Sequence, residues 1–352
     1  MCIALISTSH PSYSLIIINN RDEYLRRPTA PASFWPSPNS HILGGRDLAR
    51  STQGTWMGIT QTGKVAVLTN YRERTSDAAT GQQSRGAIVN SWLTRSKAEN
   101  QGKETEEDPT TAYVQEMVAS PTARNVGGFS LVCGYVNEPL AIVSNRSSAM
   151  DQVSWIAGET EHTVGLSNTV FDDRSWPKIL EGEKLVENVL NKHAQEEGGE
   201  DELIERLLDV LNTNSLPELG PDATAEDYLP HFRRSIFIPL IGTREKYKNK
   251  ERAPSVAGEM AAPESGPRSS CVEGHGTGSG SGPAPVKKEA EAGNDILDQS
   301  YLHGPYGTQK QTILLVKKNG RVRYFERTLY DHAAEAVPVP SGDRSFEFEV
   351  AR

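Results

Sequence analysis

The chain has 352 residues, enough for one large domain or two ordinary ones. Its formal net charge of -9 disfavours a general nucleic-acid-binding role, because phosphate backbones are bound by basic surfaces. The three cysteines, Cys2, Cys133 and Cys271, are far apart and odd in number, which argues against a disulfide framework and favours a reducing compartment. The N-terminus lacks a basic region and the chain lacks a long apolar run, so we expect neither a signal peptide nor a transmembrane segment.

The first part of the chain alternates short apolar segments with turns, which is typical of strands. Two segments flank the turn His10-Pro11-Ser12 and predict a β-hairpin, and two more flank Gln61-Thr62-Gly63. The predicted strands are 2–7, 15–19, 56–59 and 64–69. Between the two hairpins, the prolines of residues 28–39 predict an irregular loop.

Helical and extended patterns follow in blocks. Apolar residues at helical spacing predict helices from about Arg85, over 113–118, over 179–190 and over 203–211. Further strands are predicted at 129–136, 140–144, 153–157, 163–166, 235–241, 311–316 and 322–326. Strands at both ends with helices in the middle predict a layered α+β fold in which the last hairpin pairs near the first.

Composition changes abruptly between the last predicted strands. Residues 249–295 are rich in Gly, Pro, Ser, Ala, Glu and Lys and contain almost no large apolar side chains. Burial cannot offset the entropy of ordering such a segment. We therefore predict one folded domain, residues 1–352, interrupted by a disordered insertion at about 249–295, and residues 97–109 read as a shorter charged loop.

Cys2 directly follows the initiator methionine. If Met1 is removed, one residue carries both a thiol and a free α-amine, and an α-amine with a pKa of about 7.7–8.0 is partly unprotonated near neutral pH. A nucleophile beside its own base is the minimum that nucleophilic catalysis needs. The alternative remains open that Cys2 is a small buried apolar residue.

The segment Asn20-Arg21-Asp22-Glu23 is expected to follow the second strand and to lie near Cys2 if the hairpin register holds. An arginine beside a thiol favours the thiolate, and a carboxylate binds either the arginine or the α-ammonium group. Asn70 and Asn168 each end a predicted strand, and an asparagine amide can donate to an oxyanion. A solvated turn and ordinary strand-ending residues are the alternatives.

Several short segments occur in a fixed order along nearly the whole chain. They are Cys2, Asn20-Arg21-Asp22-Glu23, Gly44-Gly45-Arg46-Asp47, Gly54-Thr55-Trp56-Met57-Gly58, Leu68-Thr69-Asn70-Tyr71-Arg72, Ser84-Arg85-Gly86, Gly165-Leu166-Ser167-Asn168, Ser235-Ile236-Phe237 and Tyr306-Gly307-Thr308. In these segments the chain resembles the NRDE family, also called the transport and Golgi organisation protein 2 family. The two segments predicted to be irregular, 249–295 and 97–109, fall outside the resemblance.

The resemblance implies a four-layer αββα sandwich of the N-terminal-nucleophile hydrolase type, whose distant relatives cleave amide bonds with a terminal cysteine. It implies catalytic roles for Cys2, Arg21, Asp22, Asn70 and Asn168. Binding roles fall to Trp56, Tyr71, Arg72 and Gln309. Where family members carry arginine after Tyr-Gly-Thr, this chain has Gln309 followed by Lys310, and lysine replaces a bidentate guanidinium poorly.

The family is associated with Golgi organisation and secretion, with mitochondrial and lipid metabolism, and with haem movement. The resemblance therefore implies a role in intracellular transport or organelle homeostasis, with an acyl, lipid or haem ligand. We expect no required cofactor and no metal site, because the histidines show no metal-ligand spacing, and haem is expected only as cargo. The cytoplasm is the expected compartment, with Golgi or mitochondrial association as the family-derived alternative. An active cysteine amidohydrolase or thioesterase is the alternative function.

Overall fold

The hairpin predicted at the N-terminus forms the centre of one antiparallel sheet. In the computed structural model, which describes residues 2–71, 84–96, 108–120, 126–158, 162–242 and 304–350, this sheet has the order β10-β1-β2-β11-β12-β13. Its strands are β1 (Ile3–Ser7), β2 (Tyr13–Tyr24), β10 (Thr163–Leu166), β11 (Tyr306–Lys317), β12 (Arg321–Thr328) and β13 (Asp343–Glu349). The expected pairing of the late hairpin with the early one is confirmed, because β11 pairs antiparallel with β2 along its whole length.

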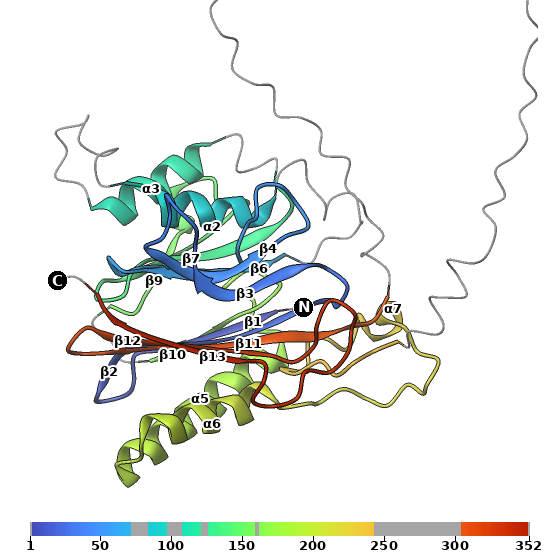
Figure 1. Cartoon of the computed structure of the whole chain (residues 1–352). Helices are drawn as coiled ribbons and strands as arrows, with labels where there is room; N and C mark the ends of the chain where they lie inside the picture. The colour runs from blue at the N-terminus through green and yellow to red at the C-terminus, as the bar shows by residue number, and fades with distance from the viewer. Residues whose placement is uncertain are drawn as a thin grey trace, which may run out of the picture.

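The second sheet is built mainly from sequential hairpins in the order β3-β4-β5-β6-β7-β8-β9. Its strands are β3 (Thr29–Phe34), β4 (Ile42–Asp47), β5 (Met57–Thr60), β6 (Lys64–Asn70), β7 (Phe129–Tyr135), β8 (Leu140–Ser144) and β9 (Ser154–Ile156). Figure 1 shows the two sheets stacked face to face.

Helices cover the outer face of each sheet, as Figure 1 shows. The helices α2 (Arg85–Thr94) and α3 (Pro109–Ala119) pack on the second sheet, and α5 (Pro177–Glu196) and α6 (Glu200–Leu211) pack on the first. Two single-turn elements, η2 (Met150–Gln152) and α7 (Ala225–Tyr228), complete the described helices. The predicted four-layer αββα sandwich is confirmed.

Strand alternation sorts the side chains of the first sheet between two buried layers. Ala4, Ile6 and Ile17 belong to the apolar cluster between the sheets, whereas Ile3, Leu5 and Ile18 belong to the cluster beneath α5 and α6. A third cluster lies between the second sheet and helices α2 and α3. Every strand of the central hairpin is therefore buried on both faces, which explains its nearly continuous apolar sequence.

Three sequence predictions were wrong, and one strand was not predicted. The proline-rich stretch contains the edge strand β3, where a register irregularity between Ala30 and Ser33 accommodates Pro31. Residues 235–241 form no named strand; their only ladder contact in the described chain is an isolated bridge between Ile241 and Tyr306. The strand β13 (Asp343–Glu349) was not predicted; it is the edge strand of the first sheet, with half-buried Phe346 and Phe348 between exposed residues.

The third wrong prediction concerns Asn20-Arg21-Asp22-Glu23, which lies inside β2 and does not follow it. Polar side chains normally end a buried strand, but here β11 supplies a paired strand beyond this point. The predicted insertion at about 249–295, Cys271 and most of the loop 97–109 lie outside the described residues, and Pro109 begins α3.

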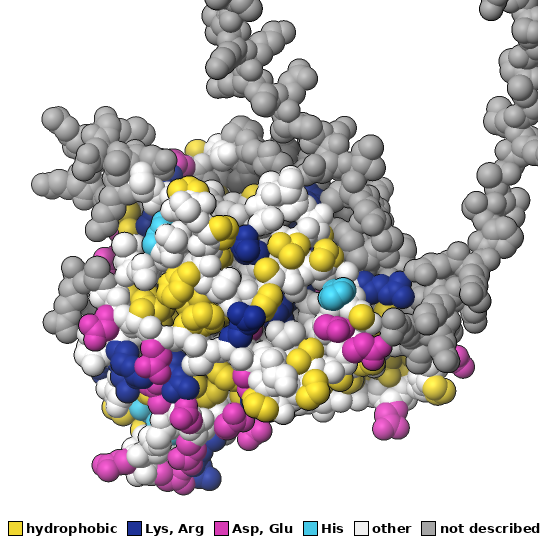
Figure 2. All heavy atoms as spheres, in the orientation of Figure 1, with side chains coloured by type: hydrophobic (Ala, Val, Ile, Leu, Met, Phe, Trp, Pro, Cys, Tyr) yellow, Lys and Arg dark blue, Asp and Glu magenta, His cyan; other side chains and the backbone are white. Residues whose placement is uncertain are grey.

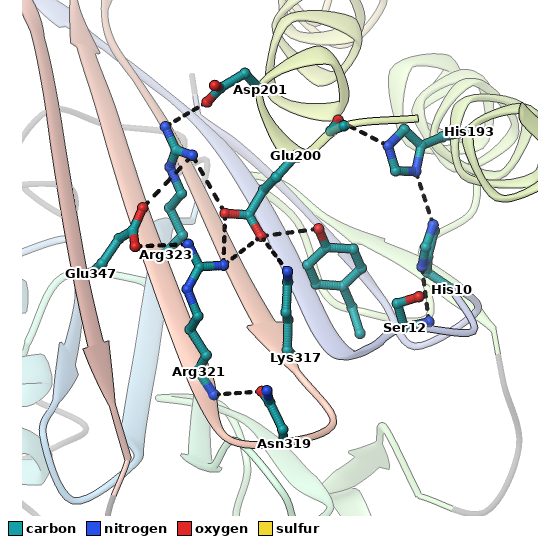
Figure 3. A network of polar contacts seen from close by, with 12 residues as sticks. His10, Ser12, His193, Glu200, Asp201, Lys317, Asn319, Arg321, Arg323 and Glu347 are labelled. Carbon is teal, nitrogen blue, oxygen red and sulfur yellow. Dashed lines mark hydrogen bonds and ion pairs between the residues drawn. The ribbon is translucent and has the colours of Figure 1, made fainter. Parts of the chain in front are cut away.

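Ion pairs join the start of α6 to the β11–β12 hairpin. Glu200 accepts hydrogen bonds from Arg321 and Tyr13 and forms ion pairs with Lys317 and Arg323, as drawn in Figure 3. The surface there carries mixed acidic and basic side chains, visible at the lower left of Figure 2. None of the helices in the described ranges combines the length and the apolar run needed to cross a bilayer.

Candidate functional site

The candidate site lies where the ends of β1, β6 and β10 meet between the two sheets. Thr69 Oγ1, at the end of β6, donates a hydrogen bond to the carbonyl oxygen of Ser167, which follows β10, over 2.8 Å. The Asn168 side-chain amide donates to the carbonyl oxygen of Asn70. These bonds join one sheet to the other, so residues 2, 70 and 168 are brought to one place although they are far apart in sequence.

Cys2 directly precedes β1, and its backbone is held by side chains. Its carbonyl oxygen accepts hydrogen bonds from Ser167 Oγ, 2.7 Å away, and from Lys178 Nζ, 3.5 Å away. Its Sγ lies 3.8 Å from the carbonyl oxygen of Asp22, as expected if the thiol donates to that oxygen. The residue is 8% exposed, which leaves a small part of it accessible.

The electrostatic surroundings of the thiol favour its protonated form. Burial is the main effect that raises the pKa of Cys2, and the Asp22 carboxylate acts in the same direction, while the Arg21 guanidinium opposes both. A thiol in this state needs a base to become a nucleophile. Sequence reasoning expected Arg21 to favour the thiolate; Arg21 does act in that direction, but burial has the larger effect.

Arg21 and Asp22 point to opposite faces of β2, because consecutive residues of a strand do so. Arg21 shares the face of Ile17, between the sheets, and Asp22 shares the face of Ile18, towards the helices. The two residues were expected to act together on Cys2. The structure instead gives each its own set of partners on its own face.

On the inner face, the Arg21 guanidinium lies 4.7 Å from the centre of the Trp56 ring and donates a hydrogen bond to Gln309. Its second nitrogen forms longer ion pairs with Glu23 and Asp47, at 3.9 Å and 3.8 Å. Gly45 makes room for Trp56, because a Cβ at residue 45 would come within 2.6 Å of the ring. Trp56 and Gln309, both predicted to bind a ligand, therefore contact Arg21.

Gln309 reaches Arg21 because β11 is irregular at that point. Thr308 pairs with Asp22 and Lys310 pairs with Arg21, so Gln309 is the extra residue of a β-bulge. Its amide nitrogen also donates to the carbonyl of Leu25, over 3.2 Å. The neighbouring Lys310 does not supply the charge of the arginine that family members carry here, because its Nζ is bound to Glu326 and Thr328, 3.2 Å and 2.8 Å away.

On the outer face, Asp22 meets a different group of residues. Its Oδ1 accepts a hydrogen bond from Thr308 Oγ1 over 2.7 Å, and its charge attracts the ammonium group of Lys178. Lys178 is fully buried, and burial lowers its pKa to about 8 although Asp22 and Cys2 act to raise it. Burial, and next the charge of Asp22, raise the pKa of the Tyr306 hydroxyl, which marks that ring as a further neighbour.

The remaining predicted residues lie at the edge of this group. The Asn70 backbone contacts Asn168, whereas Tyr71, the next residue, places its ring against the guanidinium of Arg146, 3.8 Å away. Arg72 lies outside the described residues. Within the described ranges, no group of three or more His, Cys, Asp or Glu side chains is arranged to hold a metal ion.

Comparison with known proteins agrees with the ordered segments of the sequence. The family model described as transport and Golgi organisation 2 matches residues 1–331. The chain belongs to this family. Within the family, the chain is 33% identical to the mouse transport and Golgi organization 2 homolog over 238 residues, which cover 64% of this chain and 76% of the mouse protein. The human homolog is 32% identical with the same coverage of both chains.

An uncharacterised Saccharomyces cerevisiae protein is 25% identical over 99% of this chain and over its own whole length. Two solved structures also match at low similarity. One is a Caenorhabditis elegans ortholog of N-acylethanolamine-hydrolyzing acid amidase, with a TM-score of 0.31, 11% identity, and coverage of 58% of this chain and 85% of that one. The other is a C2A mutant of the conjugated bile acid hydrolase from Clostridium perfringens, with a TM-score of 0.32, 10% identity, and coverage of 99% and 98%.

Sequence reasoning on this transport and Golgi organisation 2 family member missed Lys178, Ser167, Thr308 and Arg85. Ser167, Thr308 and Arg85 stand inside the quoted segments, but sequence reasoning gave them no role at the site. Arg85 begins α2; burial lowers the pKa of its guanidinium, against the charges of Glu23 and Cys2. Lys178 follows Pro177, whose position indicates the start of a helix but does not predict whether the next side chain is buried.

Proposed function

We propose that this chain acts in intracellular transport or organelle homeostasis by holding a small acyl-type ligand at the site around Cys2. The family to which it belongs is named for transport and Golgi organisation, which supports the cellular part of the proposal. The position of Cys2 is the observation that carries the molecular part: its thiol lies 3.8 Å from the Asp22 carbonyl oxygen, and its own carbonyl accepts from Ser167, where the two sheets are joined.

The donors and charges around Cys2 suit a polar head attached to an apolar body. Arg21 is a cation between the sheets, Asn168 carries an amide, and the apolar cluster between the sheets includes Ala4 and Leu166. The cation and the amide would bind a carbonyl or carboxylate, and the apolar cluster would bind a hydrocarbon chain. Lipids and fatty acyl groups have this division, and haem carries carboxylates on an apolar ring.

Native mass spectrometry of the purified full-length chain tests this proposal. We expect a co-purified small molecule that is lost from Arg21→Leu but retained by Lys184→Met, an exposed control on α5. Extraction and fragmentation identify it as an acyl compound or a lipid, and a Soret band on haem titration identifies haem as the cargo. A chain that carries no small molecule and binds neither acyl probes nor haem would contradict the proposal.

Hydrolysis at Cys2 is a second candidate, favoured by the Cys2 thiol 3.8 Å from the Asp22 carbonyl oxygen and by Lys178 Nζ 3.5 Å from the Cys2 carbonyl oxygen. After removal of Met1, the free α-amine would take the thiol proton, and sulfur would attack the acyl carbon to form a thioester. The amide or thioester bond of the substrate would break, with the leaving group taking that proton. Water, activated by the amine, would then add to the thioester, release the acid and restore the thiol.

Two measurements separate hydrolysis from binding alone. Intact-mass analysis reports whether Met1 is present, and its retention would exclude the α-amine as base. An acyl probe that labels Cys2 covalently in the wild-type chain, but not in Cys2→Ala, and that turns over with time would support hydrolysis. Binding of the same probe without a covalent adduct would support the carrier.

A further inference from the structure

Lys178 lies in surroundings that are unfavourable for a charged lysine side chain. It is the second residue of α5, where the positive end of the helix dipole disfavours a cation. Its side chain is fully buried, where a lysine is rarely found unless it is paired. Residues that break such rules mark functional or strained places in natural proteins.

The ammonium group of Lys178 contacts the Trp176 ring, 5.8 Å from its centre, and the Cys2 site. Its Nζ lies 3.5 Å from the Cys2 carbonyl oxygen, and its charge interacts with both the Asp22 carboxylate and the Cys2 thiolate. Its pKa of about 8 leaves it mostly protonated at neutral pH, so Lys178 carries a positive charge beside the Cys2 carbonyl.

Cys2 needs such an anchor because it lies at the end of the ladder. The first pair in register between β1 and β2 is Ile3 with Asn20, so residue 2 is outside the described strand pairing. Chain ends fray unless they are tied down. Among the described residues, Ser167 Oγ and Lys178 Nζ donate to the Cys2 carbonyl, and of these two Lys178 carries a charge.

We propose that Lys178 is a positioning residue that sets the reactivity of Cys2, its ammonium group fixing the Cys2 backbone and favouring the thiolate form of the sulfur. This inference rests on the proposed function only in placing the ligand site at Cys2. It adds Lys178 to the cationic role that sequence reasoning gave to Arg21, whose guanidinium acts on Cys2 in the same direction while it is engaged with Trp56 and Gln309.

The test measures iodoacetamide labelling of Cys2 in the full-length chain from about pH 6 to about pH 10, with the labelled peptide identified by mass spectrometry. Lys178→Gln keeps a donor for the Cys2 carbonyl and removes the charge. Ser167→Ala removes the other donor and leaves the charge. Lys184→Met removes an exposed charge from the same helix and serves as the control.

We expect Lys178→Gln to raise the apparent pKa of labelling by about one unit and to slow labelling near neutral pH about tenfold. Ser167→Ala should change the labelling rate without moving the apparent pKa, and Lys184→Met should match the wild type. Lys178→Met should show the same pKa rise as Lys178→Gln, which keeps the test valid should one of the two variants fail to fold.

An unchanged pH profile in both Lys178 variants would overturn the inference. Equal pKa shifts in Ser167→Ala and Lys178→Gln would overturn it too, because the shift would then not depend on the charge of Lys178. Labelling reads the thiol directly and needs no ligand. A chain without any bound small molecule but with the expected pKa shift would therefore refute the proposed function and uphold the role of Lys178.

Discussion

The guanidinium of Arg21 donates a hydrogen bond to the side-chain oxygen of Gln309, a residue 288 positions away in the sequence. Both side chains are buried between the sheets, and Trp56 lies on one side of the pair. The bond exists because the bulge in β11 turns Gln309 towards β2. A neutral amide at residue 309 thus accepts from Arg21, whereas a second arginine would place two like charges together.

Replacing Gln309 by leucine should destabilise the fold. The buried Arg21 nitrogen would lose its short-range acceptor, and hydrogen bonds to charged groups contribute about 1.5–3 kcal/mol. We expect the free energy of unfolding in urea to fall by about 2 kcal/mol. Gln309→Glu retains an acceptor and should keep most of the stability. Equal unfolding midpoints for wild type and Gln309→Leu would show that Arg21 finds another partner.

Replacing Lys178 by methionine should stabilise the fold while it impairs Cys2. Burial holds the folded-state pKa at about 8, below the ordinary value of 10.5, so the charged form is disfavoured in the native protein. The gain at pH 7 is expected to be about 3 kcal/mol, the equivalent of that pKa difference. Chemical denaturation measures it, and Lys184→Met should stay within about 0.5 kcal/mol of the wild type.

The pH dependence of this effect has a definite sign. Between pH 8 and pH 10.5 the unfolded chain holds the Lys178 proton and the native chain has released it, so the wild type gains stability as pH rises. The advantage of Lys178→Met should therefore shrink across this window. An advantage that is constant with pH would point to packing and not to charge.

The buried pair His10 and His193 predicts loss of stability in mild acid. His10 Nε2 lies 3.1 Å from His193 Nδ1, and His10 Nδ1 accepts from the Ser12 backbone N–H, as Figure 3 shows. Burial, together with His193 and Lys318, lowers the pKa of His10 to about 4, from 6.5. As pH falls from 6.5 towards 4, the unfolded chain gains a proton that the native chain excludes, and stability should fall by about 3 kcal/mol.

His10→Asn isolates this contribution, because the asparagine oxygen can still accept from Ser12 while the titrating ring is gone. The variant should lose less stability than the wild type between neutral pH and about pH 4.5, measured by urea unfolding at each pH. Parallel losses in both proteins would assign the acid sensitivity to other groups.

Lys310 and Glu326 form a buried ion pair whose members should be strongly coupled. Their side chains are 2% and 0% exposed, and Glu326 Oε1 also accepts from the backbone N–H of Ala32, 2.7 Å away. Lys310→Met leaves a buried carboxylate without its cation and should cost about 3–5 kcal/mol. The double variant Lys310→Met/Glu326→Leu should recover much of that loss, and a double-mutant cycle measures the coupling. Single losses that simply add would contradict it.

Local patterns were sufficient for most strands and helices, because each depends on the spacing of apolar residues within about a dozen positions. They failed where a distant segment decided the outcome. The polar segment 20–23 remains extended because β11 pairs with it, and β3 forms as an edge strand despite Pro31 because β4 accepts it.

The sequence by itself determined that Cys2 lies near Arg21 and Asp22. The two strands of the N-terminal hairpin pair in the register that their apolar pattern indicates, and this register places residue 2 beside the residues that follow Asn20. Only the tertiary structure decided which groups act on them. Strand alternation sends Arg21 to Trp56 and Gln309 and sends Asp22 to Thr308 and Lys178, and these partners come from strands and helices far along the chain. Burial, which governs the charges of Cys2 and Lys178, is a property of the packed layers and has no local signature.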